Sequence, residues 1–202
     1  MDTGSDRDRP DRRTTVVVGS SAGGLAGLGV LLNGLGAGPP VVVLVAQHLQ
    51  RTRQTLIADI LTRRTGRTVK LAEHGERPLV GVVYIAPPNR HLCVNGDGTL
   101  KLSDEAPVNF SRPAADPLFE SAARAYGSRL IGCVLTGADS DGARGVEAVK
   151  AHGGVVIVQD PSTAQFAGMP KAAVETGRAD LILHLADIAP AINRIVTSSA
   201  YP

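Results

Sequence analysis

The chain has 202 residues, of which 43% are hydrophobic and 20% charged, and it carries a formal net charge of +2. This length predicts one domain, over residues 14–198, because domains usually span about 100–200 residues. The small net charge and the absence of tryptophan disfavour a nucleic acid partner. No apolar run reaches the roughly 18 residues that cross a bilayer, so no membrane insertion is expected.

Residues 1–13 mix Asp and Arg with no apolar residue after Met1, which predicts a disordered arm and no secretory signal. Cys93 and Cys133 each lie in an apolar, strand-like segment, which predicts buried free thiols. No Cys or His pair has the spacing of metal ligands, so no metal site is expected. These features together favour a reducing, cytoplasmic location.

From residue 14 onward, strand-like apolar runs alternate with helix-like periodicity. The expected strands are residues 15–18, 40–46, 82–86, 130–135, 155–158 and 181–183. The expected helices are residues 24–35, 52–65, 116–126, 141–152, 170–176 and 188–196. Because nearly continuous apolar strands that alternate with helices are typical of parallel sheets covered on both faces, we predict a three-layer, doubly wound α/β fold.

Residues 80–102 depart from this alternation. An apolar run at 82–86 is followed by a second at 91–94, a turn at 95–98 (Asn-Gly-Asp-Gly) and a third run at 99–102. This pattern predicts a β-meander that ends in a hairpin and is inserted into the α/β fold. Residues 103–113 are a polar connection that contains proline and has no clear element.

Polar residues follow the expected strands, at the edge where ligands bind in open α/β sheets. They are Ser20, Ser21, Gln47, His48, Thr136, Gly137, Asp139, Asp141, Gln159 and Asp160. The first pair lies in a turn, residues 19–24 (Gly-Ser-Ser-Ala-Gly-Gly), that joins a strand to a helix. A serine in such a turn can stand clear of the sheet beside the amides of the helix N-terminus.

Ser21, His48 and Asp141 have the residue types of a nucleophile, a general base and an orienting carboxylate. Each also has an ordinary structural interpretation: Ser21 and Asp141 can cap helices, and His48 can be a satisfied histidine at the rim. The competing function for the first turn is phosphate binding. Residues 19–24 do not match G-x-G-x-x-G, and no Gly-Lys-Ser/Thr follows them, so a nucleotide site is disfavoured.

Five segments carry a resemblance to a known family. They are residues 19–24, 47–49 (Gln-His-Leu), 84–92 (Tyr-Ile-Ala-Pro-Pro-Asn-Arg-His-Leu), 135–143 (Leu-Thr-Gly-Ala-Asp-Ser-Asp-Gly-Ala), and 159–164 (Gln-Asp-Pro-Ser-Thr-Ala) with 168–170 (Gly-Met-Pro). From residue 14 to about residue 195, the chain resembles the catalytic domain of the CheB-type chemotaxis protein-glutamate methylesterases. Five motifs in family order make this resemblance specific.

The resemblance implies that the nucleophile is Ser21 and not Ser20, the base is His48, and the orienting carboxylate is Asp141 and not Asp139. It implies hydrolysis of glutamyl methyl esters on the cytoplasmic helices of methyl-accepting chemoreceptors, which some members combine with deamidation of receptor glutamines. It implies no cofactor. The oxyanion candidates at the rim are the backbone amides of Ala22 and Ala138, and the other rim candidates are His91 and Met169.

Three segments depart from the family pattern. The family usually has Thr at Ala22 and Gly-Met-Gly at residues 137–139, which here read Gly-Ala-Asp. The family's His-Arg-Pro-Ser-Val-Asp stretch here begins at Ser111 and reads Ser-Arg-Pro-Ala-Ala-Asp. These changes leave two alternatives open, namely an esterase or amidase of the same fold with another substrate, and a non-catalytic interaction module.

The sequence indicates less about which proteins this chain binds. Residues 1–13 are too short for the receiver domain that chemotaxis members commonly carry. This leaves three alternatives open: a separate response regulator as a partner, constitutive activity, or a pathway other than chemotaxis. Five arginines follow His48 and either meet acidic receptor helices or form a solvated helix face: Arg51, Arg53, Arg63, Arg64 and Arg67.

Overall fold

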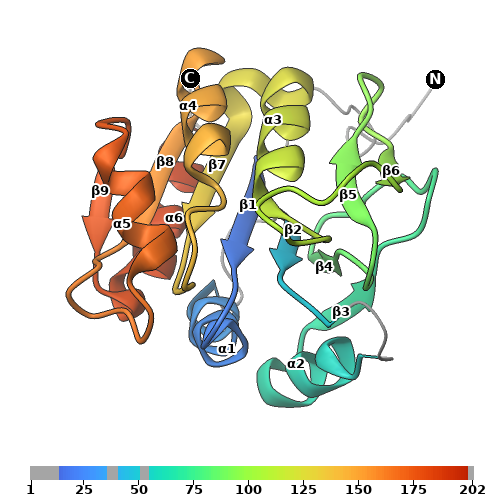
Figure 1. The fold of residues 1–202 in the computed structure, drawn as a ribbon, viewed down its shortest axis with the longest axis horizontal. Helices are drawn as coiled ribbons and strands as arrows, with labels where there is room; N and C mark the ends of the chain where they lie inside the picture. Colours follow the sequence, from blue (N-terminus) through green and yellow to red (C-terminus); the bar gives the residue numbers. More distant parts are fainter. Residues whose placement is uncertain (1–13, 36–40, 51–54, 200–202) are drawn as a thin grey trace, which may run out of the picture.

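The structure is a computed structural model that describes residues 14–35, 41–50 and 55–199. The expected arm, residues 1–13, lies outside the described residues. A seven-stranded parallel sheet forms the centre, with strand order β3-β4-β2-β1-β7-β8-β9 (Figure 1). Its strands are β1 (Thr15–Ser20), β2 (Val42–Gln47), β3 (Thr68–Leu71), β4 (Val82–Ile85), β7 (Leu130–Val134), β8 (Val155–Gln159) and β9 (Leu181–Leu183).

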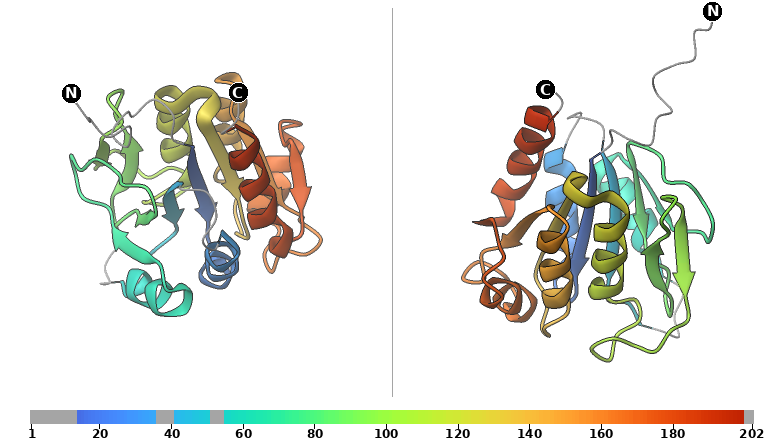
Figure 2. Two further views of the ribbon diagram at one scale, coloured as in Figure 1. Left: turned by 180° about the vertical axis from the view of Figure 1, so that it is seen from behind. Right: turned by 90° about the horizontal axis from the view of Figure 1, so that it is seen from above.

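Helices cover both faces of this sheet, as the sequence predicts. One face carries α1 (Gly24–Leu35), α2 (Ile57–Thr65) and α6 (Leu185–Ser199), and the other carries α3 (Ala115–Tyr126), α4 (Ala143–Ala151) and α5 (Gly168–Glu175) (Figure 2). Side chains alternate along a strand, so β1 sends Val16 and Val18 into one core and Val17 into the other. The three-layer α/β prediction is confirmed.

The meander prediction is wrong in its first member. Residues 82–85 form β4, which lies inside the parallel sheet between β3 and β2 and does not pair with the hairpin. The hairpin itself is confirmed: β5 (His91–Val94) and β6 (Leu100–Ser103) form a separate antiparallel pair. The sequence analysis missed β3, because it is a four-residue edge strand with one buried residue, Val69.

Other differences lie at element ends. Helix α2 begins at Ile57 and not at residue 52, and residues 51–54 lie outside the described residues. Helix α4 begins at Ala143, because Gly142 adopts a left-handed conformation with φ 92° at the N-cap. Cys133 is buried and Cys93 is half-buried, and both are free thiols. None of the helices that the structure describes is long and apolar enough to cross a membrane.

The strand order reverses direction at β1, which lies between β2 and β7. The next elements along the chain from β1 lie on one side of it, and β7 lies on the other. Crevices at such switch points form beyond the carboxyl ends of the strands. The register aligns Ser20 with Gln47 and Gly19 with Val134, so the turns after β1, β2 and β7 meet at one edge.

Candidate active site

The two serines after β1 have different environments. Ser20 is fully buried, and its hydroxyl donates a 2.7 Å hydrogen bond to Oε1 of Gln47. Ser21 is half-buried, and its carbonyl, not its hydroxyl, accepts the amide of Gly24. The Ser21 hydroxyl is therefore not the cap of α1. Its backbone is fixed from both sides, since its amide donates to the carbonyl of Thr136 at 3.0 Å and its carbonyl accepts Nε2 of Gln47 at 2.8 Å.

His48 lies directly beyond β2, next to this turn. Its amide donates to the carbonyl of Ser20 at 3.0 Å, which places the imidazole beside the end of β1. Nε2 lies 2.7 Å from Oδ2 of Asp141, which comes from the turn after β7. The structure thus brings together two side chains that are 93 positions apart in sequence. No hydrogen bond joins the Ser21 hydroxyl to His48 in the part of the chain that the structure describes, and such bonds often form only with substrate bound.

Asp141 is fully buried and is held by the start of α3. The amides of Ala115 and Asp116 donate to its carboxylate, and so does the amide of Gly142 at 3.0 Å. Asp141 therefore caps the first turn of α3, whose N-terminal dipole favours negative charge, and does not cap α4. These donors leave one direction for the imidazole, so the carboxylate can orient His48 without moving.

A second carboxylate meets the opposite side of the imidazole. Oδ2 of Asp139 lies 3.2 Å from Nδ1 of His48, and Oγ of Ser111 lies 3.2 Å from the same nitrogen. Burial lowers the pKa of His48, but the hydrogen bonds and charges of Asp139 and Asp141 outweigh burial and raise that pKa to about 9. Burial likewise opposes ionisation of Asp139, yet the hydrogen bond from His48 lowers its pKa below the usual value.

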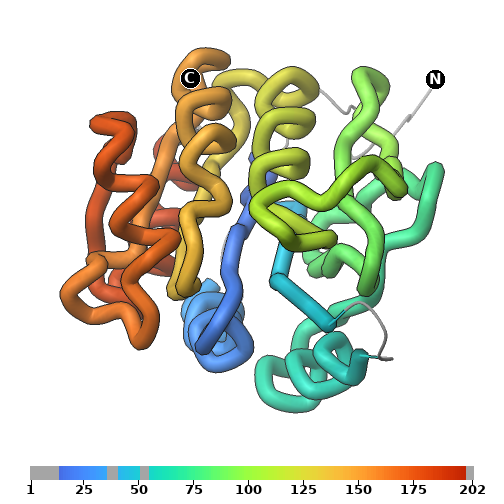
Figure 3. The backbone as a smooth tube through the Cα atoms, in the orientation of Figure 1, coloured from blue at the N-terminus to red at the C-terminus, as the bar shows by residue number. Residues whose placement is uncertain are grey.

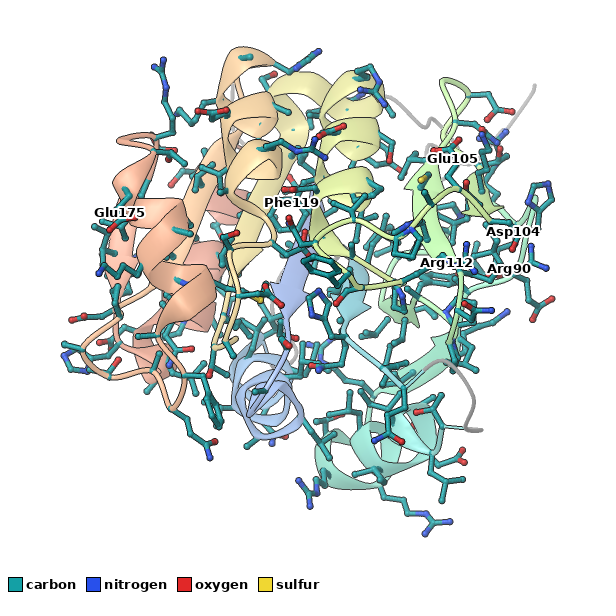
Figure 4. The ribbon with its side chains drawn as sticks, in the orientation of Figure 1. Arg90, Asp104, Glu105, Arg112, Phe119 and Glu175 are labelled. Atoms are coloured by element: carbon teal, nitrogen blue, oxygen red, sulfur yellow. The ribbon has the colours of Figure 1, made fainter. Side chains whose placement is uncertain are left out.

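The segment that supplies Ser111 is braced against the hairpin. Figure 3 traces residues 103–114 as they run from β6 back to α3. The Arg112 side chain donates to the carbonyls of Asp104 and Glu105 and to Oδ1 of Asn89, and it lies on the hairpin side of the segment (Figure 4). The guanidinium thereby holds the connection that presents Ser111 to His48.

The backbone amides of Ala22 and Ala138 are the predicted donors for an oxyanion. Neither the amide of Ala22 nor that of Ala138 donates to another described residue. Both belong to turns that Thr136 ties together, because its hydroxyl lies 3.0 Å from the carbonyl of Ala22 and also accepts the amide of Phe166. The amide of Thr136 donates to Oε1 of Gln159 at the end of β8. These bonds fix the relative positions of the turns after β1, β7 and β8.

Two rim candidates lie deeper than the sequence predicts. Met169 is fully buried, and its amide donates to the carbonyl of Gly137, so it supports the turn after β7 from beneath. His91 is 1% exposed, in β5, and its Nε2 donates to the carbonyl of Ala106. Burial lowers the pKa of His91, which favours the neutral ring. Both side chains are buried and not solvent-exposed at the rim, and Met169 packs against the same turn as Ser21.

Comparisons with known proteins identify the family of this chain. A family model described as CheB methylesterase matches residues 16–192. The chain belongs to the CheB methylesterase family. The structure matches the crystal structure of the Thermotoga maritima CheB methylesterase catalytic domain with a TM-score of 0.86 and 35% sequence identity, over 91% of this chain and 98% of that one.

This chain covers very different shares of two curated relatives. The chain is 40% identical to a Leptospira interrogans protein provisionally named protein-glutamate methylesterase/protein-glutamine glutaminase, over 89% of this chain and 93% of that protein. It is also 40% identical to protein-glutamate methylesterase/protein-glutamine glutaminase 1 of Paramagnetospirillum magneticum, over 92% of this chain but 50% of that protein. The chain therefore spans nearly all of one relative and half of the other.

For this CheB methylesterase family member, the sequence analysis did not predict which polar residues join the turns and which contact His48. Gln47, Thr136 and Gln159 all stood among the expected rim residues, and the structure shows that they join turns to each other through hydrogen bonds. Ser111 was noted only as a departure from the family pattern, and its contact with His48 has no sequence signal. Within residues 14–35, 41–50 and 55–199, no group of His, Cys, Asp or Glu side chains is arranged to hold a metal ion.

Replacing Gly168 by alanine is expected to lower kcat by about 10- to 100-fold while the protein still folds. A Cβ at Gly168 would meet the carbonyl of Ala138 and come within 2.8 Å of the carbonyl oxygen of Asp139. Because both are backbone atoms, the turn after β7 must shift, and small displacements of catalytic groups cost about that much. The measurement is kcat together with thermal unfolding.

The matched control for this substitution is Gly29→Ala in α1. Gly29 has no atom within 4 Å of an added Cβ, so the change is expected to stabilise the helix by about 0.5–1 kcal/mol and leave kcat unchanged. Equal kcat values for the Gly168 variant and the native chain would show that the turn tolerates the shift.

Proposed function

We propose that this chain is a serine esterase that removes methyl groups from glutamyl side chains on chemoreceptor helices. The observation that carries the proposal is the placement of a half-buried serine beside a histidine whose Nε2 lies 2.7 Å from a buried carboxylate. The names of its relatives supply the substrate class, since both are described as protein-glutamate methylesterases. The proposed roles are nucleophile for Ser21, general base for His48 and orienting carboxylate for Asp141.

The proposed reaction proceeds through an acyl-enzyme. Ser21 Oγ attacks the ester carbonyl as His48 Nδ1 takes the hydroxyl proton, since Nε2 is held by Asp141. The amides of Ala22 and Ala138 stabilise the oxyanion, a contribution of about 3 kcal/mol per donor. The imidazolium gives its proton to the departing methoxide, and methanol leaves. His48 then takes a proton from water, which attacks the acyl group. The bond between the acyl carbon and Ser21 Oγ breaks, Oγ regains its proton from the imidazolium, and glutamate is released.

Deamidation of glutamine uses the same acyl-enzyme. Attack of Ser21 on a glutaminyl side chain forms the same glutamyl ester, and His48 protonates the leaving group, which departs as ammonia. The relatives' second name, protein-glutamine glutaminase, supports this activity. We place both reactions in the cytoplasm, because the receptor helices that carry these side chains lie there.

The test is methanol release from cytoplasmic receptor fragments that carry glutamyl methyl esters, with unmethylated fragments as the control. Release that requires both the ester and the native Ser21 supports the proposal. Ester hydrolysis confined to small esters would favour an esterase of the same fold with another substrate. Absence of turnover on either class, with the protein folded, would indicate a non-catalytic module. Ammonia release from glutamine-bearing fragments tests the second activity.

A further inference from the structure

His48 is held by a carboxylate at each of its two ring nitrogens. Nε2 lies 2.7 Å from Asp141, and Nδ1 lies 3.2 Å from Asp139. The second carboxylate does not swing freely, because its other oxygen, Oδ1, accepts the amide of Asp141 at 2.9 Å. The 34% exposure of the Asp139 side chain leaves it at the mouth of the site, between the imidazole and solvent.

The protonation state of His48 follows from what a carboxylate can do. An ionised carboxylate accepts hydrogen bonds and donates none, so each of the two contacts needs a proton on the facing nitrogen. An imidazole that meets both carboxylates is therefore the doubly protonated cation. If Nδ1 loses its proton, its lone pair faces the lone pairs of Asp139 and the contact becomes repulsive.

The other groups around the ring do not offset these charges. Ser111, from the segment before α3, is neutral and meets Nδ1 with a hydroxyl. The end of β1 contributes a backbone carbonyl, which accepts the His48 amide, and β2 contributes the neutral Gln47. The carboxylate of Asp116, in the first turn of α3, accepts the amide of Gly145 and the side chain of Arg144.

We propose that Asp139 is a positioning residue that holds His48 as an imidazolium, with Nδ1 occupied by the Asp139 carboxylate, until that nitrogen loses its proton. The inference rests on the proposed function, in which Nδ1 is the nitrogen that must accept the Ser21 proton. In the protonated state Asp139 occupies this nitrogen, and Ser21 has no base. Loss of the proton breaks the contact with Asp139 and frees Nδ1 for the nucleophile in one event.

The pKa of His48 is shifted in the direction that the proposal requires. Despite burial, the two carboxylates raise the pKa of His48 to about 9. A base with that pKa is neutral in about one molecule in a hundred at pH 7, so kcat/KM should rise about tenfold per pH unit until the pKa is reached. Asp139 thereby shifts the pH dependence of kcat/KM to alkaline values. Asp141 is sufficient as the carboxylate that orients His48.

The first arm of the test is the pH dependence of kcat/KM for Asp139→Asn on a glutamyl methyl ester. We expect the acidic limb to move down by at least one pH unit and the rate at pH 7 to rise about tenfold or more, because the charge opposite Nδ1 is gone. The alkaline plateau should stay within about threefold of native. Asp104→Asn is the matched control, since it removes an exposed carboxylate that pairs with Arg90 on the hairpin.

The second arm measures the protonation of His48 directly, without enzyme turnover. The ring protons of His48, assigned by comparison with His48→Gln, are titrated by NMR in the native chain, in Asp139→Asn and in Asp139→Ala. We expect a native midpoint well above 7 that falls by at least one unit in both variants. A midpoint that does not move overturns the role of Asp139, even if methanol is released. A midpoint that moves supports it, even if the receptor ester is not the substrate.

Discussion

Replacing Ser21 by alanine is expected to lower kcat for methyl ester hydrolysis by about 10⁴-fold or more. Without Oγ no acyl-enzyme can form, and single knockouts of such nucleophiles cost about as much as removing the whole triad. The fold should be unaffected, because Ser21 is held by its backbone amide and carbonyl and not by its hydroxyl. The measurement is methanol release under single-turnover conditions, with thermal unfolding as the check on folding.

Ser20→Ala is the matched control for the nucleophile. It removes the neighbouring hydroxyl, which is buried and donates to Gln47. The expected result is a destabilisation of about 1–3 kcal/mol, since Oε1 of Gln47 loses its partner, with kcat lowered far less than in Ser21→Ala. If Ser20→Ala abolished turnover and Ser21→Ala did not, the assignment of the nucleophile would be reversed.

Asp141→Asn is expected to lower kcat by about 10⁴-fold and also to destabilise the fold by about 3 kcal/mol. The carboxylate accepts backbone amides on both oxygens as well as Nε2 of His48, and the NH₂ of asparagine would face donors in place of an acceptor. The loss of charge also removes the partner that fixes the tautomer of His48. The measurements are kcat at the pH of the native plateau and the free energy of unfolding.

Asp116→Asn separates the two effects of the Asp141 substitution. Asp116 is also a buried carboxylate at the start of α3, but it binds the amide of Gly145 and the side chain of Arg144 and does not touch His48. We expect a loss of stability of similar size and little change in the His48 titration midpoint. A native-like midpoint in Asp141→Asn would contradict the pairing of Asp141 with His48.

Much of the architecture is predictable because local chemistry and burial act together. The apolar runs that become β1, β2, β7 and β8 face a core on each side, so nearly every residue in them is apolar, and the helices between them show an apolar face. Strands that end together place Ser21, His48 and Asp141 at one edge. Residues 82–85 were wrongly assigned to the meander and β3 was missed, although the hairpin was predicted correctly. Nothing local distinguishes a short edge strand from a loop or states which strand is its neighbour.

The sequence by itself determined the α/β class, the family motifs and the identity of the candidate catalytic residues. The tertiary structure alone decided how these side chains pair: Ser20 on Gln47, Asp141 on the first turn of α3, and Asp139 on Nδ1 of His48. Strand and helix patterns arise from neighbours within a few residues, so they are present in the sequence itself. A hydrogen bond depends on distances of a few tenths of an ångström between residues about 90 positions apart, and only the packed fold sets those distances.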